Sequence, residues 1–372
     1  MTRVEHLVAH LGTERTGSTA IQTALSRRRD LLASRGVLFP RALGKSSHGI
    51  LATACMDGPL GEFERAALKD AGAEREDLPT VLAERIDAEL AQIADPRLIV
   101  VSSEHLHSRL LNLESKRRLA AHLTPLAERL TLLVYLRPQA DLAASIHHFR
   151  IKNGAPRPGE MFPDLDERRW AYFDYCTMLD EYREAFPAAR IVAVPFERGS
   201  LAEGDVVRDA LGRAGVPCDA DDPLPRENNA ALSAEAGLFA ERLNAMLPRR
   251  VGGAPNPRRD PVVERALADF SGSAPRIDRA AASAFQARFA ASNAALRERW
   301  VPDLPSSFDA LPRSGQSPEP DEAALMEVAA AVIGRLSAEL RRQRGLVAAA
   351  RADAEEARAE VEAAREAAPE RP

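Results

Sequence analysis

Short, largely apolar segments that alternate with helix-forming segments constrain this chain more than any other feature. Such runs occupy Val4–Leu11, Leu98–Ser102 and Leu130–Leu136, and further strands are expected at Gly36–Pro40 and Arg190–Phe196. Strands buried on both faces read as unbroken apolar runs, whereas half-exposed strands alternate with polar residues. Helices between such strands form right-handed βαβ units, which build a parallel sheet. The pattern predicts a three-layer α/β fold with a central parallel sheet flanked by helices.

Apolar residues at helical spacing predict where those helices lie. Helices are expected from Gly17 through Leu32, from Pro79 through Leu90, and near residues 114–128, 166–186, 201–214 and 232–247. Pro138 is expected to begin one more helix, because proline is tolerated in the first turn. Residues 41–78 are expected to be rich in loops.

The composition changes near the C-terminus and suggests a division of the chain. We expect an α/β domain over residues 1–301, a Pro- and Ser-rich linker over 302–320, and a helix over 321–368. Spacings of three and four, typical of a heptad seam, connect Val347, Ala350, Ala354, Ala357, Val361, Ala364 and Ala368. Because a seam made mostly of alanine buries little area, a solvated or partner-dependent helix is expected. A coiled coil that makes a homo-oligomer is the alternative.

Charge and composition exclude several classes of protein. The net charge is −5 over 372 residues, so a general nucleic-acid coat is not expected, since backbone binding needs concentrated Lys and Arg. No signal peptide is evident, and no apolar run approaches the roughly 18 residues that span a bilayer. Cys55, Cys176 and Cys218 are scattered without metal-ligand spacing. A cytoplasmic protein without a transmembrane segment is therefore expected.

A glycine-containing loop lies between the first strand and the first helix. Its sequence is Gly12-Thr-Glu-Arg-Thr-Gly-Ser-Thr19, in the place where α/β proteins bind phosphate with backbone N–H groups at a helix start. The spacing fits a P-loop, except that Ser18 stands where a nucleotide triphosphate loop has lysine. Arg15 is the only cation within the loop. The loop predicts a P-loop-type fold and a site for one phosphate-like group, with hydroxyl donors from Ser18 and Thr19.

A second anion-binding pattern follows the most apolar strand. Arg137 ends that strand, and Asp141, Ser145 and His148 share one face of the next helix. An Arg at the carboxyl end of a strand and a hydroxyl on the following helix can both donate hydrogen bonds to one phosphate.

Together the two motifs resemble those of the sulfotransferases that use 3′-phosphoadenosine 5′-phosphosulfate (PAPS). The loop is similar to the family's 5′-phosphosulfate loop, and Arg137, Asp141 and Ser145 fit the offsets of its 3′-phosphate motif. The N-terminal segment HLGTERTGSTAIQTAL, residues 102–105 (SSEH) and residues 228–233 (NNAALS) look most like bacterial members thought to act on saccharides. The likeness spans about residues 4–300.

The resemblance implies roles for particular residues. Arg15, Thr16, Gly17, Ser18 and Thr19 would hold the 5′-phosphosulfate of PAPS, and Arg137 and Ser145 would hold the 3′-phosphate. Arg15 replaces the family's lysine, which supports charge on the leaving oxygen, and the two side chains are not interchangeable. No metal is expected, because the leaving group is a phosphate oxygen already held by the loop.

The acceptor side is predicted from the residues after the strand at 98–102. Glu104 is the expected general base for an acceptor hydroxyl or amine, with His105 as the alternative. His48 and His148 are candidates for lining an acceptor pocket for a glycan or small molecule. Two other functions stay open. One is a P-loop kinase of a small molecule, and the other is a catalytically weak binding protein with the same fold.

Overall fold

The structure is a computed structural model that describes residues 3–218, 224, 231–252, 254–271, 277–309 and 321–366. The chain divides into two compact units. The first unit comprises Met1–His147, Gly159–Asn229 and Ile277–Gln316. The second comprises His148–Pro158, Ala230–Arg276 and Ser317–Pro372.

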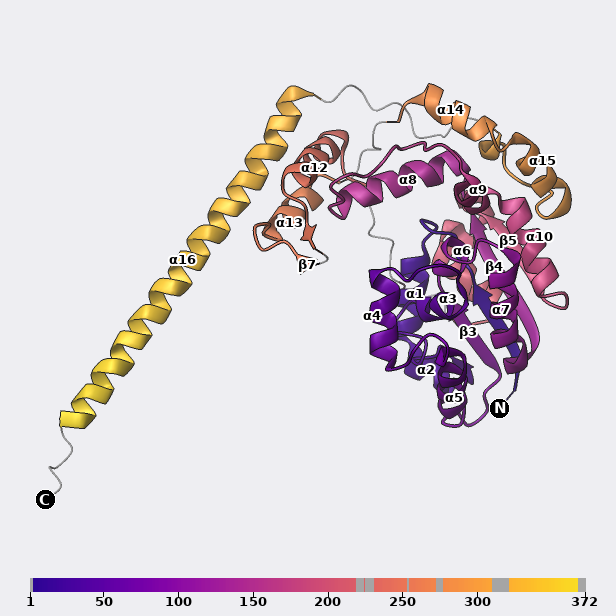
Figure 1. Ribbon diagram of the computed structural model, residues 1–372, viewed down its shortest axis with the longest axis horizontal. Coiled ribbons are helices and arrows are strands. Elements are labelled where there is room, and N and C mark those ends of the chain that lie inside the picture. Colours follow the sequence, from indigo (N-terminus) through magenta and orange to yellow (C-terminus); the bar gives the residue numbers. More distant parts are fainter. Residues whose placement is uncertain are drawn as a thin grey trace, which may run out of the picture. The chain divides into compact units, whose positions relative to one another are not determined.

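A five-stranded parallel sheet forms the centre of the first unit (Figure 1). Its order is β2-β3-β1-β4-β5. The strands are β1 (Val4–His10), β2 (Val37–Leu38), β3 (Leu98–Ser102), β4 (Ala127–Leu136) and β5 (Arg190–Pro195). His10 at the end of β1 is in register with Ser102 of β3 and Leu133 of β4, so the segments that follow these strands begin at one edge. The predicted α/β fold with a parallel sheet is confirmed.

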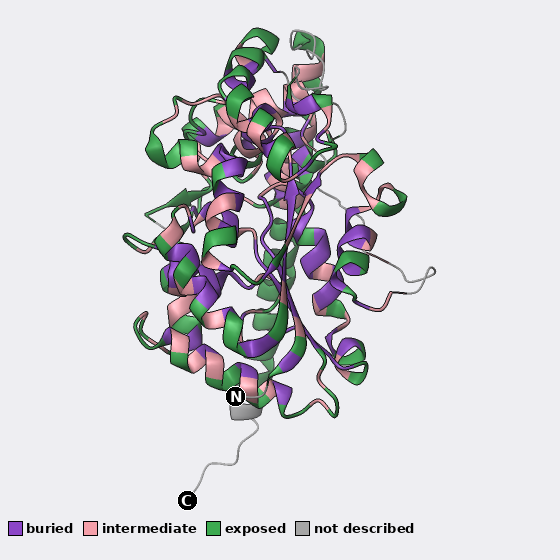
Figure 2. Cartoon of the chain, turned by 90° about the vertical axis from the view of Figure 1, so that its right-hand side faces the viewer, coloured by how far each residue is buried: buried purple, intermediate pink, exposed green. Residues whose placement is uncertain are grey.

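Alternate strand residues face two different helical layers. Val8, Leu133 and Tyr135 pack with α1 and α11, whereas Leu7 and Leu132 pack with α5, α7 and α10. In Figure 2 the strands carry long buried stretches between partly exposed helices. These helices are α1 (Ser18–Arg27), α5 (Leu78–Leu90), α7 (Leu113–Leu123), α10 (Tyr175–Ala185) and α11 (Val206–Ala214). Burial on both faces explains the apolar runs Leu7–Ala9 of β1, Leu98–Val101 of β3 and Leu132–Leu136 of β4.

Several helix boundaries differ from the prediction. The helix expected at 17–32 divides at Arg28 into α1 and α2 (Arg29–Ser34), and the loop-rich segment 41–78 contains α3 (Gly49–Cys55) and α4 (Glu62–Ala71). The helix expected at 166–186 is likewise divided into two helices, α9 (Glu167–Phe173) and α10. Asp174, which ends α9, leaves the helical conformation and accepts a hydrogen bond from Thr177 N at 3.2 Å as the N-cap of α10.

The remaining elements of the first unit are short. They are α6 (His105–Ser108), α14 (Arg279–Ala287), α15 (Ala290–Arg299) and the 3₁₀ turns η1 (Thr124–Leu126), η2 (Arg198–Ser200), η3 (Ala202–Gly204) and η4 (Ser306–Phe308). Helix α8 (Gln139–Lys152) begins in this unit. The start of the predicted linker is packed, since Phe308 is buried and its carbonyl accepts from Gln286 and Asn293 at 2.8 and 3.0 Å. Residues 310–320 lie outside the described residues.

The second unit has its own small core. Ile151, Ala240 and Val263 pack with Val328 and Val332 of the last helix. Its elements are α12 (Ala234–Met246), β6 (Arg250–Val251), β7 (Ala254–Pro255), α13 (Val262–Ala268) and α16 (Glu322–Glu366). The predicted C-terminal helical extension is present, with residues 367 and 368 outside the described range. Within the described part of the chain, every helix falls short of the length or the apolar character needed to cross a bilayer.

Candidate functional site

The loop between β1 and α1 is held in shape by its own hydroxyl groups. Thr16 Oγ1 donates to Thr13 O at 2.8 Å, and Ser18 Oγ donates to the same carbonyl at 3.2 Å. Both side chains are buried, while Thr19 is exposed at the start of α1. The Ser18 hydroxyl, which the sequence predicted as a donor to an anion, donates to the carbonyl of Thr13 in this structure. Backbone N–H groups at the helix start are the donors that such a loop offers.

Two glycines allow the loop to lie close to its neighbours. Gly17 has φ of +81°, and an added Cβ would lie 2.6 Å from Cγ1 of Val206 on α11. Gly12 has φ of +99°, and an added Cβ would lie 3.0 Å from Cα of Glu104. Neither position accepts a side chain without movement. The close approach at Gly12 also means that the backbone of Glu104 lies against the loop between β1 and α1.

The two predicted anion motifs meet through direct contacts. Arg15 Nε donates to Ser145 Oγ of α8 at 3.1 Å, and Arg137 Nη1 donates to Arg15 O at 3.2 Å. The carbonyl of Arg137 in turn accepts from the hydroxyl of buried Tyr175 at 2.8 Å. Two guanidinium groups and one hydroxyl are therefore gathered beside the loop, although residues 15 and 145 are far apart in sequence. Such a group suits recognition of phosphate or sulfate.

Asp141 and His148 lie on the same helix as Ser145. Burial raises the pKa of the Asp141 carboxyl, and the nearby Arg137 cation opposes that shift. His148 is half-buried in the part of α8 assigned to the second unit. The helix therefore carries both residues as the spacing predicted, with Asp141 close to Arg137.

Glu104 and His105 follow β3 at the edge of the sheet where the loop lies. Glu104 is half-buried at the N-cap position of α6, and Gln22 Nε2 of α1 donates to Glu104 Oε2 at 2.7 Å. Burial lowers the pKa of His105, whose ring packs edge-on against Phe63 at 4.7 Å. Glu104 thus lies next to the loop with its carboxylate hydrogen-bonded to Gln22, and His105 lies beside it.

His48 lies in the core rather than on a surface. Its side chain is fully buried, its Nδ1 accepts from the backbone N–H of Ser102 at 3.2 Å, and its ring lies 4.2 Å from that of Phe39. Burial lowers the pKa of His48 to about 3. These contacts join the loop that carries His48 to the end of β3.

Sequence reasoning missed three residues around the loop, namely Glu14, Tyr172 and Gln22. Tyr172 of α9 donates its hydroxyl to Glu14 Oε2 at 2.6 Å, and its carbonyl lies 2.9 Å from His107 Nε2. Burial and the Glu14 carboxylate raise the pKa of Tyr172 well above its usual value. Gln22 left a signal in the sequence, as a polar residue within the first helix, whereas the contact between Glu14 and Tyr172 joins segments 158 residues apart.

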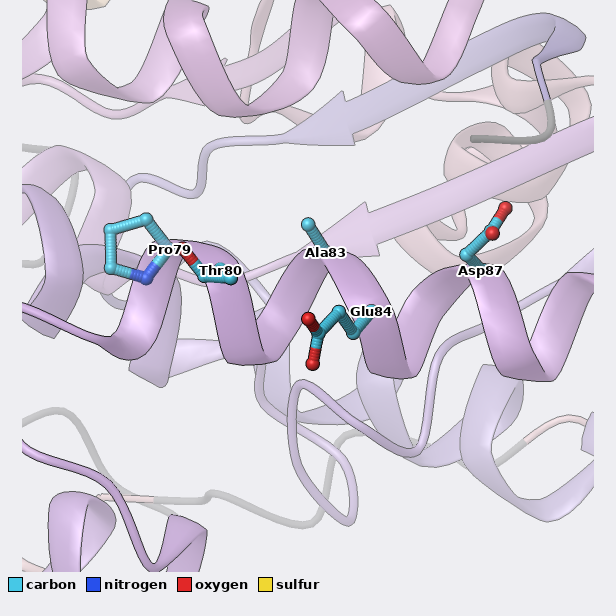
Figure 3. A pocket seen from close by; sticks show the side chains of 5 residues that line it. All are labelled: Pro79, Thr80, Ala83, Glu84 and Asp87. Carbon is cyan, nitrogen blue, oxygen red and sulfur yellow. The ribbon is translucent and has the colours of Figure 1, made fainter.

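A cavity of 240 Å³ is lined by residues of α1, of α11 and of the segment that follows β5. Ala20 of α1, Phe196 after β5 and Val206 of α11 line it, together with Leu201 and Asp205. Its volume is below the roughly 300–1,000 Å³ of complete ligand pockets. A second hollow of 410 Å³ is lined by Pro79, Thr80, Ala83, Glu84 and Asp87, all on α5 (Figure 3). It contains none of the predicted site residues. Within the described ranges, no group of three or more His, Cys, Asp or Glu side chains is arranged to hold a metal ion.

The parallel sheet and the glycine loop between β1 and α1 define an α/β protein of the P-loop type. No family model matches the chain. A stretch of 116 residues, 31% of the chain, is 29% identical to an uncharacterized protein of Archaeoglobus fulgidus and spans 31% of that relative's length.

Two solved structures are similar in part. One is a sulfotransferase from Alicyclobacillus acidocaldarius, with a TM-score of 0.43 and 12% identity over 83% of this chain and 100% of that one. The other is the sulfotransferase domain from the curacin biosynthetic pathway, with a TM-score of 0.29 and 12% identity over 59% and 77%. Because both TM-scores lie below 0.5, we assign no family from them.

Proposed function

We propose that this protein is a sulfotransferase that moves a sulfuryl group from PAPS to a hydroxyl or amine of an acceptor, a saccharide or glycoconjugate. The observation that carries the proposal is the contact between the two anion motifs, in which Arg15 reaches Ser145 and Arg137 reaches the loop backbone. A donor with phosphate groups at both its 3′ and 5′ positions needs two anion sites close together. A triphosphate loop would instead need lysine at position 18, where this chain has serine.

Each motif takes one end of the donor in this proposal. Residues 16–19 offer backbone N–H groups at the start of α1, and Arg15 adds a cation for the 5′-phosphosulfate. Arg137 and Ser145 bind the 3′-phosphate. The cavity beside Phe196 takes the adenine ring.

Glu14 is the residue of the loop that could make it unsuitable for an anion, because its carboxylate would repel a negatively charged group. Its Oε2 accepts the Tyr172 hydroxyl at 2.6 Å, so the negative charge is engaged by a donor from α9. The adjacent cations Arg15 and Arg137 supply the opposite charge. The residues present therefore fit a phosphosulfate group.

The chemistry is an in-line displacement at sulfur. The acceptor oxygen or nitrogen forms a bond to sulfur while the bond from sulfur to the bridging phosphate oxygen breaks, which leaves adenosine 3′,5′-bisphosphate. Glu104 takes the acceptor proton, and Gln22 fixes its carboxylate through the bond at 2.7 Å. Arg15 stabilises the negative charge that develops on the leaving oxygen. Because arginine donates a proton poorly, its contribution is electrostatic.

Calorimetric titration with adenosine 3′,5′-bisphosphate, beside ATP with Mg²⁺, tests this function. We expect micromolar binding of the bisphosphate that weakens roughly 10- to 150-fold in Arg137→Ala, the equivalent of about 1.5–3 kcal/mol for one charged hydrogen bond. Arg117→Ala is the matched control, because Arg117 is exposed and pairs only with Glu114 and Glu184 among the described contacts. Binding of ATP with Mg²⁺ instead, at equal strength in Arg137→Ala, would refute the proposal and favour a kinase.

A further inference from the structure

Helix α16 extends far beyond the part that packs in its own unit. Val328, Val332 and Leu336 pack against α12 and α13, and Arg335 pairs with Asp269. From residue 340 to residue 361, every residue is exposed. Figure 1 shows this segment as one straight, continuous helix. Because an isolated helix gains little from its own hydrogen bonds in water, a long exposed helix needs stabilisation from elsewhere.

An exposed apolar stripe runs along α16 with a period of seven. The large apolar side chains on it are all more than half exposed: Met326 (64%), Ile333 (62%), Leu340 (52%), Val347 (54%) and Val361 (55%). Ala354 occupies the remaining position of the series. Ala350 and Ala357 lie three residues after Val347 and Ala354, which completes an alternating heptad seam. A strict seven-residue repeat is the pattern of a left-handed coiled coil.

Charges flank the seam in a complementary arrangement. With the stripe at heptad position a, the e positions are Arg344, Arg351 and Arg358, and the g positions include Glu339, Asp353 and Glu360. In a parallel, in-register pair, each g residue faces the e residue five positions later in the other helix. Glu339 then faces Arg344 of a second copy, and Asp353 faces Arg358. An antiparallel pair would instead place arginine opposite arginine.

We propose that residues 340–361 of α16 form a parallel, in-register, two-stranded coiled coil with the same segment of a second copy of this chain. The seam supplies the apolar contact, the small alanines allow close approach of the helices, and the e and g charges select the parallel orientation. Gln343 lies at a core d position, where a polar residue favours one register. The proposal does not depend on the sulfotransferase reaction.

Cysteine cross-linking of the full chain tests orientation and register. In a parallel, in-register pair, residue 347 lies opposite itself, so Val347→Cys is expected to form a disulfide between copies under mild oxidation. Ala348→Cys is the matched control, because it lies one residue along on the outer face. Both variants carry Cys218→Ser, which removes the most accessible native thiol. Equal cross-linking of the two variants, or none in either, would overturn the proposal.

Charge reversal tests whether the flanking residues select the partner. Arg358→Glu and Asp353→Lys are each expected to raise the dimer dissociation constant at least tenfold in sedimentation equilibrium, because each sets like charges opposite one another. An equimolar mixture of the two variants is expected to recover dimers, since the carboxylate introduced at position 358 of one chain then faces the ammonium group introduced at position 353 of the other. Both sites are exposed and distant from α12 and α13, so circular dichroism is expected to show an unchanged fold. A wild-type monomer at all concentrations, or a dimer indifferent to both reversals, would overturn the proposal.

Discussion

Replacing Gly17 by alanine is expected to strain the loop between β1 and α1 in two independent ways. The left-handed conformation at φ +81° and ψ 8° costs an L-residue roughly 1–2 kcal/mol. The new Cβ would lie 2.6 Å from Val206 Cγ1, whereas carbon atoms in contact prefer about 3.5–4.0 Å. To relieve this overlap, the loop or Val206 must shift by about 1 Å in a packed region, which costs about 1–3 kcal/mol. Backbone strain and overlap together lower the free energy of unfolding by about 2–5 kcal/mol, a large part of a typical domain's stability.

Urea unfolding followed by circular dichroism, with a double-mutant cycle, separates the two contributions. Val206→Ala in the Gly17→Ala background is expected to recover the part due to overlap and to leave the part due to backbone strain. Gly212→Ala is the control on the same helix as Val206. Gly212 has open space around it and no positive φ, so alanine there is expected to stabilise the helix by about 0.5–1 kcal/mol. If Gly17→Ala unfolds like the wild type, or shows no coupling to Val206, the account of this loop is wrong.

Three further predictions concern pH, donor binding and turnover. Burial lowers the pKa values of His10, His48 and His107 to about 4, 3 and 4. Because the unfolded chain, with histidine pKa near 6.5, binds protons first, stability present at pH 7 is lost as the pH falls toward 4, by up to ~1.4 kcal/mol per pH unit for each histidine. Urea titrations at pH 7, 6 and 5 measure this slope, and a flat profile would contradict it. Ser145→Ala is expected to weaken binding of adenosine 3′,5′-bisphosphate about fivefold in calorimetry, for the loss of about 1 kcal/mol from one hydrogen bond; unchanged affinity would remove Ser145 from the donor site. Glu104→Gln is expected to lower turnover by roughly 10²- to 10⁴-fold while bisphosphate affinity stays the same, and an active variant would transfer the role of base elsewhere.

The sheet could be predicted from sequence because its cause is local. A strand covered on both faces must be apolar over most of its length, and Leu98–Val101 of β3 shows that requirement in its composition. The helical layers were less predictable. Asp174 begins a second helix within an apparently continuous pattern, because its carboxylate caps the N–H of Thr177 and its own backbone leaves the helical region. Such a break depends on one side-chain contact, which periodicity does not record.

The candidate site also has a part that the sequence predicts and a part that it does not. Strand ends and helix starts placed Arg15, Arg137 and Ser145 at one edge of the sheet, because parallel strands end together. The contact from Arg15 to Ser145 joins residues 130 positions apart, and that distance in sequence hides it.

The Glu14 carboxylate shows more clearly that the charge of the loop depends on contacts between distant segments. Counting loop charges from the sequence sets one cation against one anion, which is a poor site for phosphate. The hydroxyl of Tyr172, 158 residues away, engages that anion, while Arg137 adds a second cation from another strand. The electrostatic character of the loop is therefore a property of three segments of the chain. A motif that matches within one segment identifies where an anion can bind, and only the tertiary contacts decide whether the charge there is favourable.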